Sequence, residues 1–519
     1  MSTTMRSILV NFYWIFGSCV FMILVRTIVH RTFTYIRQMR RMTPLLNSLD
    51  HLPTKPIIGS LYYLIKDTKD FMTERGEKVI ELISKYESAI FWMMHVPIVS
   101  LGKHEDIQAV LNNSRCSRKF LRLLEGTLGD SIFVLHGEKW RRSRKILLAA
   151  FSPNRFHRFF SIIKEYSSFT TKALELFCDT DEIIDIKHYI LSLNANSFVR
   201  NISDYEINKS NNEDIAMINA VIEIARLECT RFLIPWLHPK FIYKTYLFFL
   251  GKLHLYREIL QLPKKIIKER SMCNMTRNLQ NDKIAEDTDT ASPELFIDML
   301  LQRHNGDADF TEKHIRAEIF SVISAGYETT AATVCNVLLM LAMHLEVQEK
   351  VYDEIKTVFG NDDREVQIED VKKLVYMEQC INETLRKFAV IPSTLRVHNE
   401  DIMLSDGHII PAGCLIFLGF YLSHHDKTFF PNADNWDPER FSPERYGDCK
   451  NAFLPFGGGP RLCIGTKYAM ASIKTQLVHL IRRYHFSTEM KMQDIHLVLD
   501  ILLRNDSGYW LKLHSRPKN

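Results

Sequence analysis

The chain has 519 residues, of which 46% are hydrophobic, so it is long enough to bury a large core. Its 66 basic and 61 acidic residues give a net charge of +5, which excludes the strong basic excess that nucleic-acid binding requires. The ten cysteines contain no C-x-x-C pair, which argues against a disulfide framework or a structural zinc site and favours a reducing compartment.

The N-terminal segment differs from the rest of the chain. Ser7 to Val25 carry no charge, and five arginines follow between residues 26 and 41. Such a run is long enough to cross a bilayer as a helix, and the arginines place its C-terminal side in the cytosol. A cleaved signal peptide is the alternative, but the run is long for one and lacks an obvious cleavage site. We predict an uncleaved transmembrane anchor with a basic stop-transfer segment over residues 1–42.

Three prolines between residues 43 and 60 predict a stiff hinge, which leaves residues 61–519 as the main globular domain. Amphipathic spacing in this domain predicts helices, for example at 138–150, 212–230, 311–344 and 346–358. Shorter β-rich runs occur near 93–101, 394–405 and 409–417. The fold class is therefore mainly α with a small β region.

Two further stretches of the domain have an unusual composition. Residues 271–292 are polar and lack periodicity, so we expect an exposed loop there. Residues 231–262 are rich in aromatic and aliphatic side chains. They fit either a buried core or a surface that dips into the membrane and lines the path of a substrate.

A basic run, Trp140-Arg141-Arg142-Ser143-Arg144-Lys145, lies on the first of the predicted helices. Trp140 and Arg144 stand four residues apart and face the same side, where they suit an anionic group. Arg141, Arg142 and Lys145 then point partly outward. They form either a solvated helix face or a basic patch that attracts an acidic electron-donor protein.

Residues 324–330, with the sequence SAGYETT, interrupt a long apolar helix with residues that are poor helix formers. One interpretation is an ordinary buried helix whose threonines bond back to their own preceding turn. The other is a helix that opens slightly beside a cofactor to make room for O₂ and an ordered water. Thr329 would then bind the oxygen, and Glu328 would feed a proton relay.

Glu383 and Arg386 lie three residues apart on one face of a predicted helix, a spacing that is common among weak, solvated pairs. Arg440, in the segment Asp437-Pro438-Glu439-Arg440-Phe441, supplies a possible third member. A Glu383–Arg386–Arg440 network would lock the core below a cofactor, and a buried network of this kind fails when one member is removed.

The most informative stretch runs from Phe456 to Gly465 and fits the pattern F-x-x-G-x-R-x-C-x-G. Its glycines, Gly459 among them, permit tight turns against a planar cofactor. Cys463 precedes a predicted helix, whose N-terminal dipole stabilises a thiolate, and Arg461 suits a haem propionate. A phosphate loop is the alternative, but no Gly-Lys-Ser/Thr sequence follows. The pattern therefore predicts a haem whose iron is bound by the Cys463 thiolate.

Taken together and in this order, the four signatures resemble the cytochrome P-450 superfamily of haem-thiolate monooxygenases. The resemblance extends from the proline hinge to the C-terminus. The segments GPRLCIGTKYAM and HGEKWRRSRKILLAAF are most similar to the clan that contains fatty-acid ω-hydroxylases and many insect detoxification enzymes. The anchor resembles that of animal microsomal members, which implies the endoplasmic reticulum membrane with a cytosolic catalytic domain.

The resemblance also implies roles for single residues. Cys463 would be the axial ligand of haem b, Phe456 would shield its sulfur, and backbone N–H groups beyond it, near Gly465, would temper its charge. The propionates would be met by Trp140, Arg144, Arg396 and Arg461. Glu328 and Thr329 would manage protons. Thiolate donation favours O–O cleavage, which leads to insertion of oxygen into C–H bonds.

Two positions depart from the family pattern. Some members of the clan carry a glutamate esterified to the haem where this chain has Ala325, so we expect a non-covalent haem and claim no ω-selectivity. Tyr327 is larger and more polar than expected beside an oxygen site. Ala325, Val390 and Ile391 are expected to face the substrate, and plain core packing is the alternative for each.

The predicted function is oxygenation of a lipophilic fatty acid, hormone or foreign compound, with electrons from NADPH through a flavoprotein reductase and with cytochrome b5 as a second donor. A haem-thiolate isomerase or dehydratase is an alternative, but such relatives often lack the threonine at position 329. A haem protein that binds a ligand without turnover is another alternative, which the proton relay and the basic face disfavour.

Overall fold

The computed structural model describes residues 88–517 with short gaps, together with parts of residues 22–62. The gaps are residues 94–95, 114–115, 118–122, 208–211, 282–293, 308–309 and 361–363. Most of the predicted anchor therefore lies outside the described residues. Within the described part of the chain no single helix is long and apolar enough to cross a membrane. One helix pair, Glu312–Met343 with Leu345–Phe359, meets the length and composition criteria but is bent by 114°.

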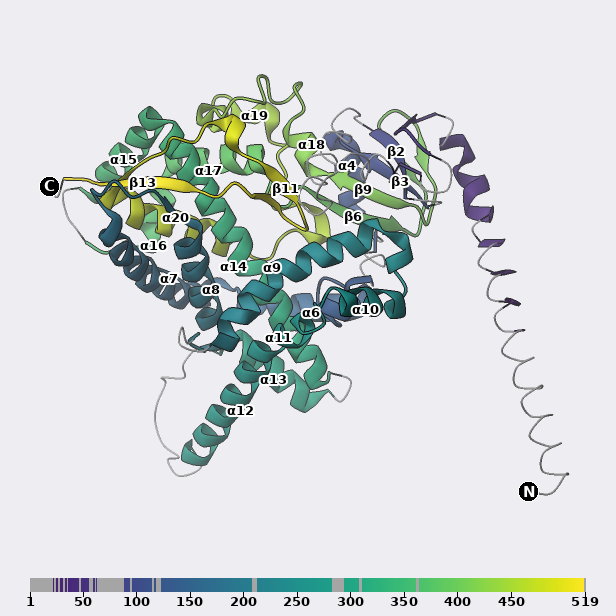
Figure 1. The fold of residues 1–519 in the computed structure, drawn as a ribbon, viewed down its shortest axis with the longest axis horizontal. Helices are drawn as coiled ribbons and strands as arrows, with labels where there is room; N and C mark the ends of the chain where they lie inside the picture. The colour runs from purple at the N-terminus through teal and green to yellow at the C-terminus, as the bar shows by residue number, and fades with distance from the viewer. Residues whose placement is uncertain are drawn as a thin grey trace.

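Helices form most of the molecule (Figure 1), which confirms the mainly α prediction. Four of them match the helices predicted from apolar spacing, namely α6 (Gly137–Ala150), α9 (Asn212–Leu233), α14 (Glu312–Met343) and α15 (Leu345–Phe359). The longer helices among the rest are α4 (His104–Asn112), α7 (Pro153–Leu174), α8 (Lys187–Ser203), α10 (Lys240–Phe249), α12 (Gln261–Asn281), α13 (Phe296–Gly306), α17 (Val375–Phe388) and α20 (Thr466–Arg483). The shorter ones are α5 (Glu125–Leu128), α11 (Leu255–Glu258), α16 (Ile368–Lys373), α18 (Phe420–His424) and α19 (Tyr446–Cys449).

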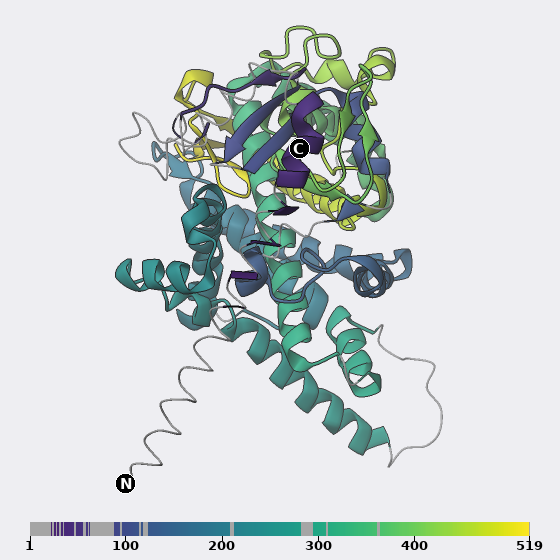
Figure 2. The same ribbon diagram turned by 90° about the vertical axis from the view of Figure 1, so that its right-hand side faces the viewer.

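Helix α14 is the central element of the fold. It passes through the middle of the molecule in two perpendicular views (Figures 1 and 2) and packs against α8, α17 and α20. Its side chains are buried along most of its length, from Ile315 to Ala342. A helix that is apolar on nearly all sides must be enclosed by other elements, which explains why α14 shows no clear amphipathic stripe.

Among the described residues, the β region consists of one larger sheet and three small ones. The larger sheet has the order β1-β2-β3-β9-β6-β4, in which β3 and β9 are parallel and β6 runs antiparallel to β9. Its strands are β1 (Asp50–His51), β2 (Ser88–Met93), β3 (Val96–Leu101), β4 (Cys116–Ser117), β6 (Ser393–His398) and β9 (Leu415–Gly419). Met42 and Leu45, near the described N-terminal end, pack into the core of this sheet.

The three smaller sheets contain the remaining strands. Strands β10 (Tyr484–Ser487), β13 (Trp510–Ser515) and β5 (Ile184–Asp185) form one sheet. The hairpins β7 (Ile402–Met403) with β8 (Ile409–Ile410), and β11 (Leu497–Leu499) with β12 (Leu503–Asn505), form the others. The β11–β12 hairpin carries a charged residue that pairs with α14, as described below.

The prediction of a loop at 271–292 is wrong for residues 271–281, because α12 continues to Asn281. The reason is a tertiary contact that periodicity does not reveal. Arg270 of α12 donates to both carboxylate oxygens of Asp298 in α13, at 2.7 and 2.6 Å, and Asn274 donates to the same carboxylate at 3.1 Å. These bonds fix the polar helix in place. Residues 282–292 lie outside the described residues.

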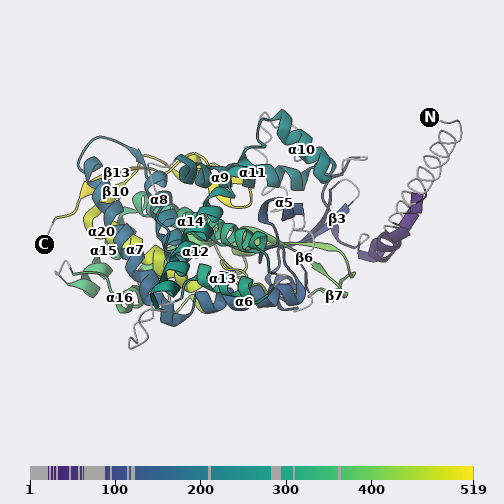
Figure 3. The ribbon, with the colours of Figure 1, turned by 90° about the horizontal axis from the view of Figure 1, so that it is seen from below.

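The aromatic stretch 231–262 is partly buried and partly exposed. Tyr243 and Leu247 of α10 are buried in the core. Phe241, Phe248 and Phe249 of the same helix are 80%, 67% and 81% exposed. Helix α10 stands at the edge of the molecule in Figure 3. One face of α10 is therefore core, and the other is an exposed aromatic surface.

Candidate active site

The loop before α20 is held in shape by its glycines. Gly457 and Gly459 have φ values of +72° and +63°, where a side chain would be strained. A Cβ atom on Gly459 would lie 2.1 Å from the carbonyl oxygen of Leu111 in α4. The N–H of Cys463 donates to the carbonyl of Phe456 at 3.1 Å, which closes the loop on itself. Phe456, the first residue of the predicted motif, is thus held next to Cys463.

Cys463 lies three residues before the first residue of α20. Part of the residue is exposed to solvent, but many protein atoms surround the thiol and reduce its hydration. This desolvation raises the pKa of the thiol. The Gly465 N–H, the Thr466 hydroxyl and the Arg144 guanidinium oppose the rise, because each favours negative sulfur. An accessible soft sulfur with three such neighbours fits a thiolate ligand to haem iron.

Three of the four predicted propionate residues form a stack beside this loop. The Arg461 guanidinium lies 3.9 Å from the centroid of the Trp140 ring, and that of Arg144 lies 5.5 Å from it. Both Nη atoms of Arg144 donate to the carbonyl of Leu462, at 3.2 and 3.1 Å. The two cations are therefore held next to Cys463, where they suit a bound dianion.

Arg461 has a second set of partners in the segment before α6. Its Nη atoms donate to the carbonyls of Ile132 and Leu135, at 3.3 and 3.0 Å. Arg396, the fourth predicted residue, is buried on β6 and donates locally to Thr394 Oγ1 at 2.7 Å and to the carbonyl of Leu395 at 2.9 Å.

On α14, Ala325, Thr329 and Ala332 keep partial exposure although their helical neighbours are mostly buried. Their spacing of four and three residues places them on one face. The Thr329 hydroxyl donates to the carbonyl of Ala325 at 2.7 Å, so the structure has the back-bonding arrangement that the sequence left open. The helix is continuous rather than opened, and Gly326 has a packing role, because a Cβ there would lie 2.1 Å from the Phe198 ring.

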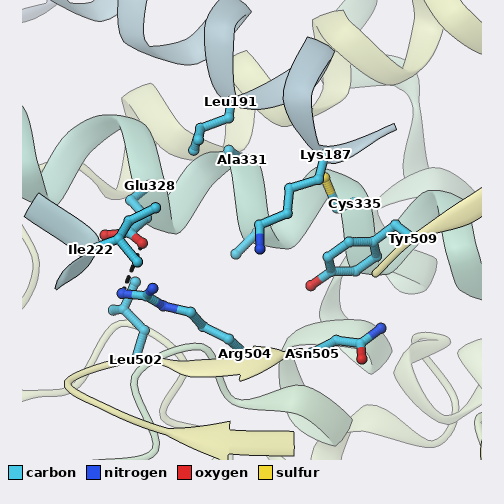
Figure 4. Close-up of a pocket in the computed structure, with 11 residues that line it drawn as sticks. Lys187, Leu191, Ile222, Glu328, Ala331, Cys335, Leu502, Arg504, Asn505 and Tyr509 are labelled. Carbon is cyan, nitrogen blue, oxygen red and sulfur yellow. Dashed lines mark ion pairs between the residues drawn. The ribbon is translucent and has the colours of Figure 1, made fainter. Parts of the chain in front are cut away.

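Glu328 is buried and pairs with a partner that sequence reasoning missed. Its carboxylate lies 2.9 Å from Nη2 of Arg504 on β12, as Figure 4 shows. Burial raises the pKa of Glu328, and Arg504 and Lys187 oppose this rise. The three side chains line a cavity of about 20 Å³, enough for one water molecule. Glu328 thus sits beside a water-sized cavity whose wall is mostly apolar.

Arg504 belongs to a longer chain of charges. Its Nη1 lies 3.9 Å from Asp500, which also lies 3.3 Å from Nε of Arg226 on α9. Tyr327, in contrast, is fully buried and donates to the carbonyl of Ile218 on α9 at 3.3 Å. This contact accounts for the large polar side chain, which packs toward α9.

The Glu383–Arg386–Arg440 network is present and buried. Arg386 donates to both oxygens of Glu383, at 2.7 and 2.9 Å, and Nε of Arg440 lies 3.4 Å from the same carboxylate. Further along, Val390 is buried, Ile391 is partly buried, and the carbonyl of Val390 accepts from the N–H of Leu503 at 3.0 Å. The segment after α17 is thereby joined to the β11–β12 hairpin.

The architecture and the cysteine loop define a haem-thiolate fold, and comparison with known proteins agrees. The family model described as Cytochrome P450 matches residues 51–512, so the chain belongs to the cytochrome P450 family and is a haem-thiolate monooxygenase. Members of this family hold haem through a cysteine thiolate and use electrons derived from NADPH. The membership predicted from the four signatures is confirmed.

Three relatives show how far the similarity reaches. Human cytochrome P450 4V2 is 29% identical over 509 residues, which cover 95% of this chain and 94% of that protein. Probable cytochrome P450 4aa1 of Drosophila melanogaster is 28% identical over 470 residues, 89% of each chain. Human cytochrome P450 4F8 is 26% identical over 456 residues, which cover 85% of this chain and 86% of that protein. These relatives agree with the predicted clan.

Proposed function

We propose that this enzyme inserts one oxygen atom of O₂ into a lipophilic substrate, with electrons delivered from NADPH by a flavoprotein reductase. The observation that supports it most is the accessible Cys463 sulfur among the Gly465 N–H, Thr466 and Arg144. Haem, when bound, supplies the oxygen-activating chemistry. Turnover of a lipophilic probe that requires both NADPH and reductase would support the proposal, whereas conversion without either would favour an isomerase or dehydratase.

The residues of the chain have distinct roles in this proposal. Cys463 ligates the iron, Phe456 covers the sulfur, and the Gly465 N–H lowers the negative charge on it. Trp140, Arg144, Arg396 and Arg461 hold the propionates. Glu328 supplies protons from its buried position on α14, and Thr329 accepts or donates a hydrogen bond at the oxygen-binding face.

Substrate contacts are proposed for Ala325, on the partly exposed face of α14, and for Val390 and Ile391, in the segment after α17, because all three are apolar. Because residue 325 is alanine, it offers no carboxylate for an ester bond, and the haem is non-covalent. Extraction with acidified organic solvent should therefore remove all haem from the protein. Haem that stays with the polypeptide would contradict this part of the proposal.

A basic patch made of Arg141, Arg142 and Lys145 is proposed as the docking surface of the reductase and of cytochrome b5. All three side chains are exposed on α6, the helix that carries Trp140 and Arg144. Opposite charge on a donor protein accelerates encounter, and the effect falls with salt. Arg142→Glu with Lys145→Glu should slow reduction more at low than at high ionic strength. An unchanged reduction rate at low salt would reject this surface.

We propose that the protein lies at the endoplasmic reticulum membrane with its catalytic domain in the cytosol. Val29, Phe33 and Ile36 are exposed with helical spacing on one face of the N-terminal segment, and α10 exposes Phe241, Phe248 and Phe249. Exposed apolar surfaces of this kind suit a lipid interface. Fractionation with microsomes that resists high salt but yields to detergent would support this location, and a fully soluble protein would contradict it.

A further inference from the structure

A buried carboxylate on α14 has no part in the proposed chemistry. Glu318 lies eight residues before Gly326, and its side chain is almost fully buried. Its Oε2 accepts the backbone N–H of Ile132 at 3.1 Å. The Ser143 hydroxyl of α6 also interacts with this carboxylate. Burying a carboxylate is costly even when it has such partners, so its presence requires an explanation.

The loop that Glu318 contacts is pressed closely against α14. Gly129 has a φ of +55°, and a Cβ there would lie 2.7 Å from Cβ of Ala317, the neighbour of Glu318. Only a glycine allows the chain to approach α14 so closely. Ser131, Ile132 and Val134 that follow are all buried. The segment 131–135 is thus fixed on one side by α14.

The same segment is fixed on its other side by the cysteine loop. Ile132 gives its N–H to Glu318 and its carbonyl to Nη1 of Arg461, at 3.1 and 3.3 Å. The carbonyl of Leu135 accepts from Nη2 of Arg461 at 3.0 Å. Arg461 stacks on Trp140 and lies two residues before Cys463. A continuous path of hydrogen bonds therefore runs from Glu318 to the arginine beside Cys463.

We propose that Glu318 is a positioning residue for the haem, because it holds segment 131–135 in the place where two carbonyls orient Arg461. This inference rests on the proposed contact between Arg461 and a haem propionate. An aliphatic residue at position 318 would leave the N–H of Ile132 buried without an acceptor.

If Glu318 positions the haem in this way, the stability of haem binding should depend on whether Glu318 is protonated. Burial raises the pKa of Glu318 to about 7, opposed by the Ile132 N–H, the Ser143 hydroxyl and Arg303 of α13. The nearby pair of Asp130 and His314, at 3.5 Å, also joins this loop to α14. An effect of Glu318 must therefore be separated from one of His314.

The test compares Glu318→Gln, which keeps an acceptor but cannot ionise, with Glu318→Leu, which has none. The full-length holoenzyme is titrated from pH 5 to 9, and the rate of haem transfer to an apoprotein acceptor is measured with the ferrous carbonyl spectrum. In the native protein and in His314→Gln we expect the rate of haem transfer to change near pH 7. In Glu318→Gln this rate should not depend on pH. In Glu318→Leu haem loss should be roughly tenfold faster than in the native protein. Glu312→Gln, an exposed site on the same helix, should behave as the native protein.

The outcomes separate the inference from the proposed function. If Glu318→Gln keeps the native pH transition, or if His314→Gln abolishes it, the inference is overturned even when Glu318→Leu does not fold. If Arg461→Leu accelerates haem loss while both Glu318 variants match the native protein, only the inference fails. If Arg461→Leu retains haem at the native rate, the proposed propionate contact itself is wrong.

Discussion

Replacement of Arg386 by methionine should remove much of the stability of the domain. Arg386 is fully buried and donates to both oxygens of Glu383 and to the carbonyls of His424, Ala433 and Asn435, at 3.0, 2.8 and 3.2 Å. Loss of one partner from a buried ion pair costs about 3–5 kcal/mol, and each carbonyl left without a donor adds about 1 kcal/mol. We therefore expect a loss of at least about 5 kcal/mol from a net stability of about 5–15 kcal/mol.

The assay is urea denaturation of the full-length protein, followed both by far-ultraviolet circular dichroism and by haem absorbance. A matched control is Lys350→Met, which breaks an exposed pair with Glu439 that is 3.1 Å long. Exposed pairs contribute about 0–1 kcal/mol, so this variant should unfold near the native midpoint. An Arg386→Met variant that loses less than about 1 kcal/mol would refute the reasoning that a partnerless buried carboxylate is costly.

Three further predictions concern α14. Arg504→Gln should raise the pKa of Glu328 further, because the cation that opposes the rise is removed. The measurement is an infrared titration of the carboxyl stretch of Glu328. An unchanged titration in Arg504→Gln would show that the ion pair does not stabilise the charged carboxylate. Glu318 has a folded pKa of about 7 against an ordinary 4.5, so the free energy of unfolding should fall by about 3 kcal/mol as the pH rises from 4.5 to 7. Glu318→Gln should abolish this pH dependence of the denaturation midpoint. If the dependence is unchanged in Glu318→Gln, another group causes it. Thr329→Val should lower product formation by about a hundredfold while NADPH oxidation continues with release of peroxide, and full coupling in that variant would exclude the proposed role.

The helices and the cysteine loop could be predicted from sequence because their signals are local. Apolar spacing identified α6 and α15, and the pattern from Phe456 to Gly465 indicated a loop before a helix. The pair of Glu383 and Arg386 was predictable for the same reason, since the two residues lie three positions apart in the sequence. The burial of this pair with Arg440, which is more than 50 positions further along the chain, depends on tertiary contacts that only the structure shows.

Other features could not be predicted because they arise from pairing of distant segments. Nothing in the sequence near Arg504 indicates that it meets Glu328, which lies far away in the chain. The helical start of 271–292 depends on the bond between Arg270 and Asp298. Gly326 fits the motif for a reason that the sequence does not show, because the ring of Phe198 occupies the space of its missing Cβ.

The central claim is that the sulfur of Cys463 binds the haem iron, and the ferrous carbonyl spectrum of Cys463→Ala tests it most directly. Cys273→Ala, which changes another exposed cysteine, serves as the control. We expect the control to keep the red-shifted carbonyl band and oxygen insertion, and Cys463→Ala to lose both. Persistence of that band together with product formation in Cys463→Ala would contradict the account.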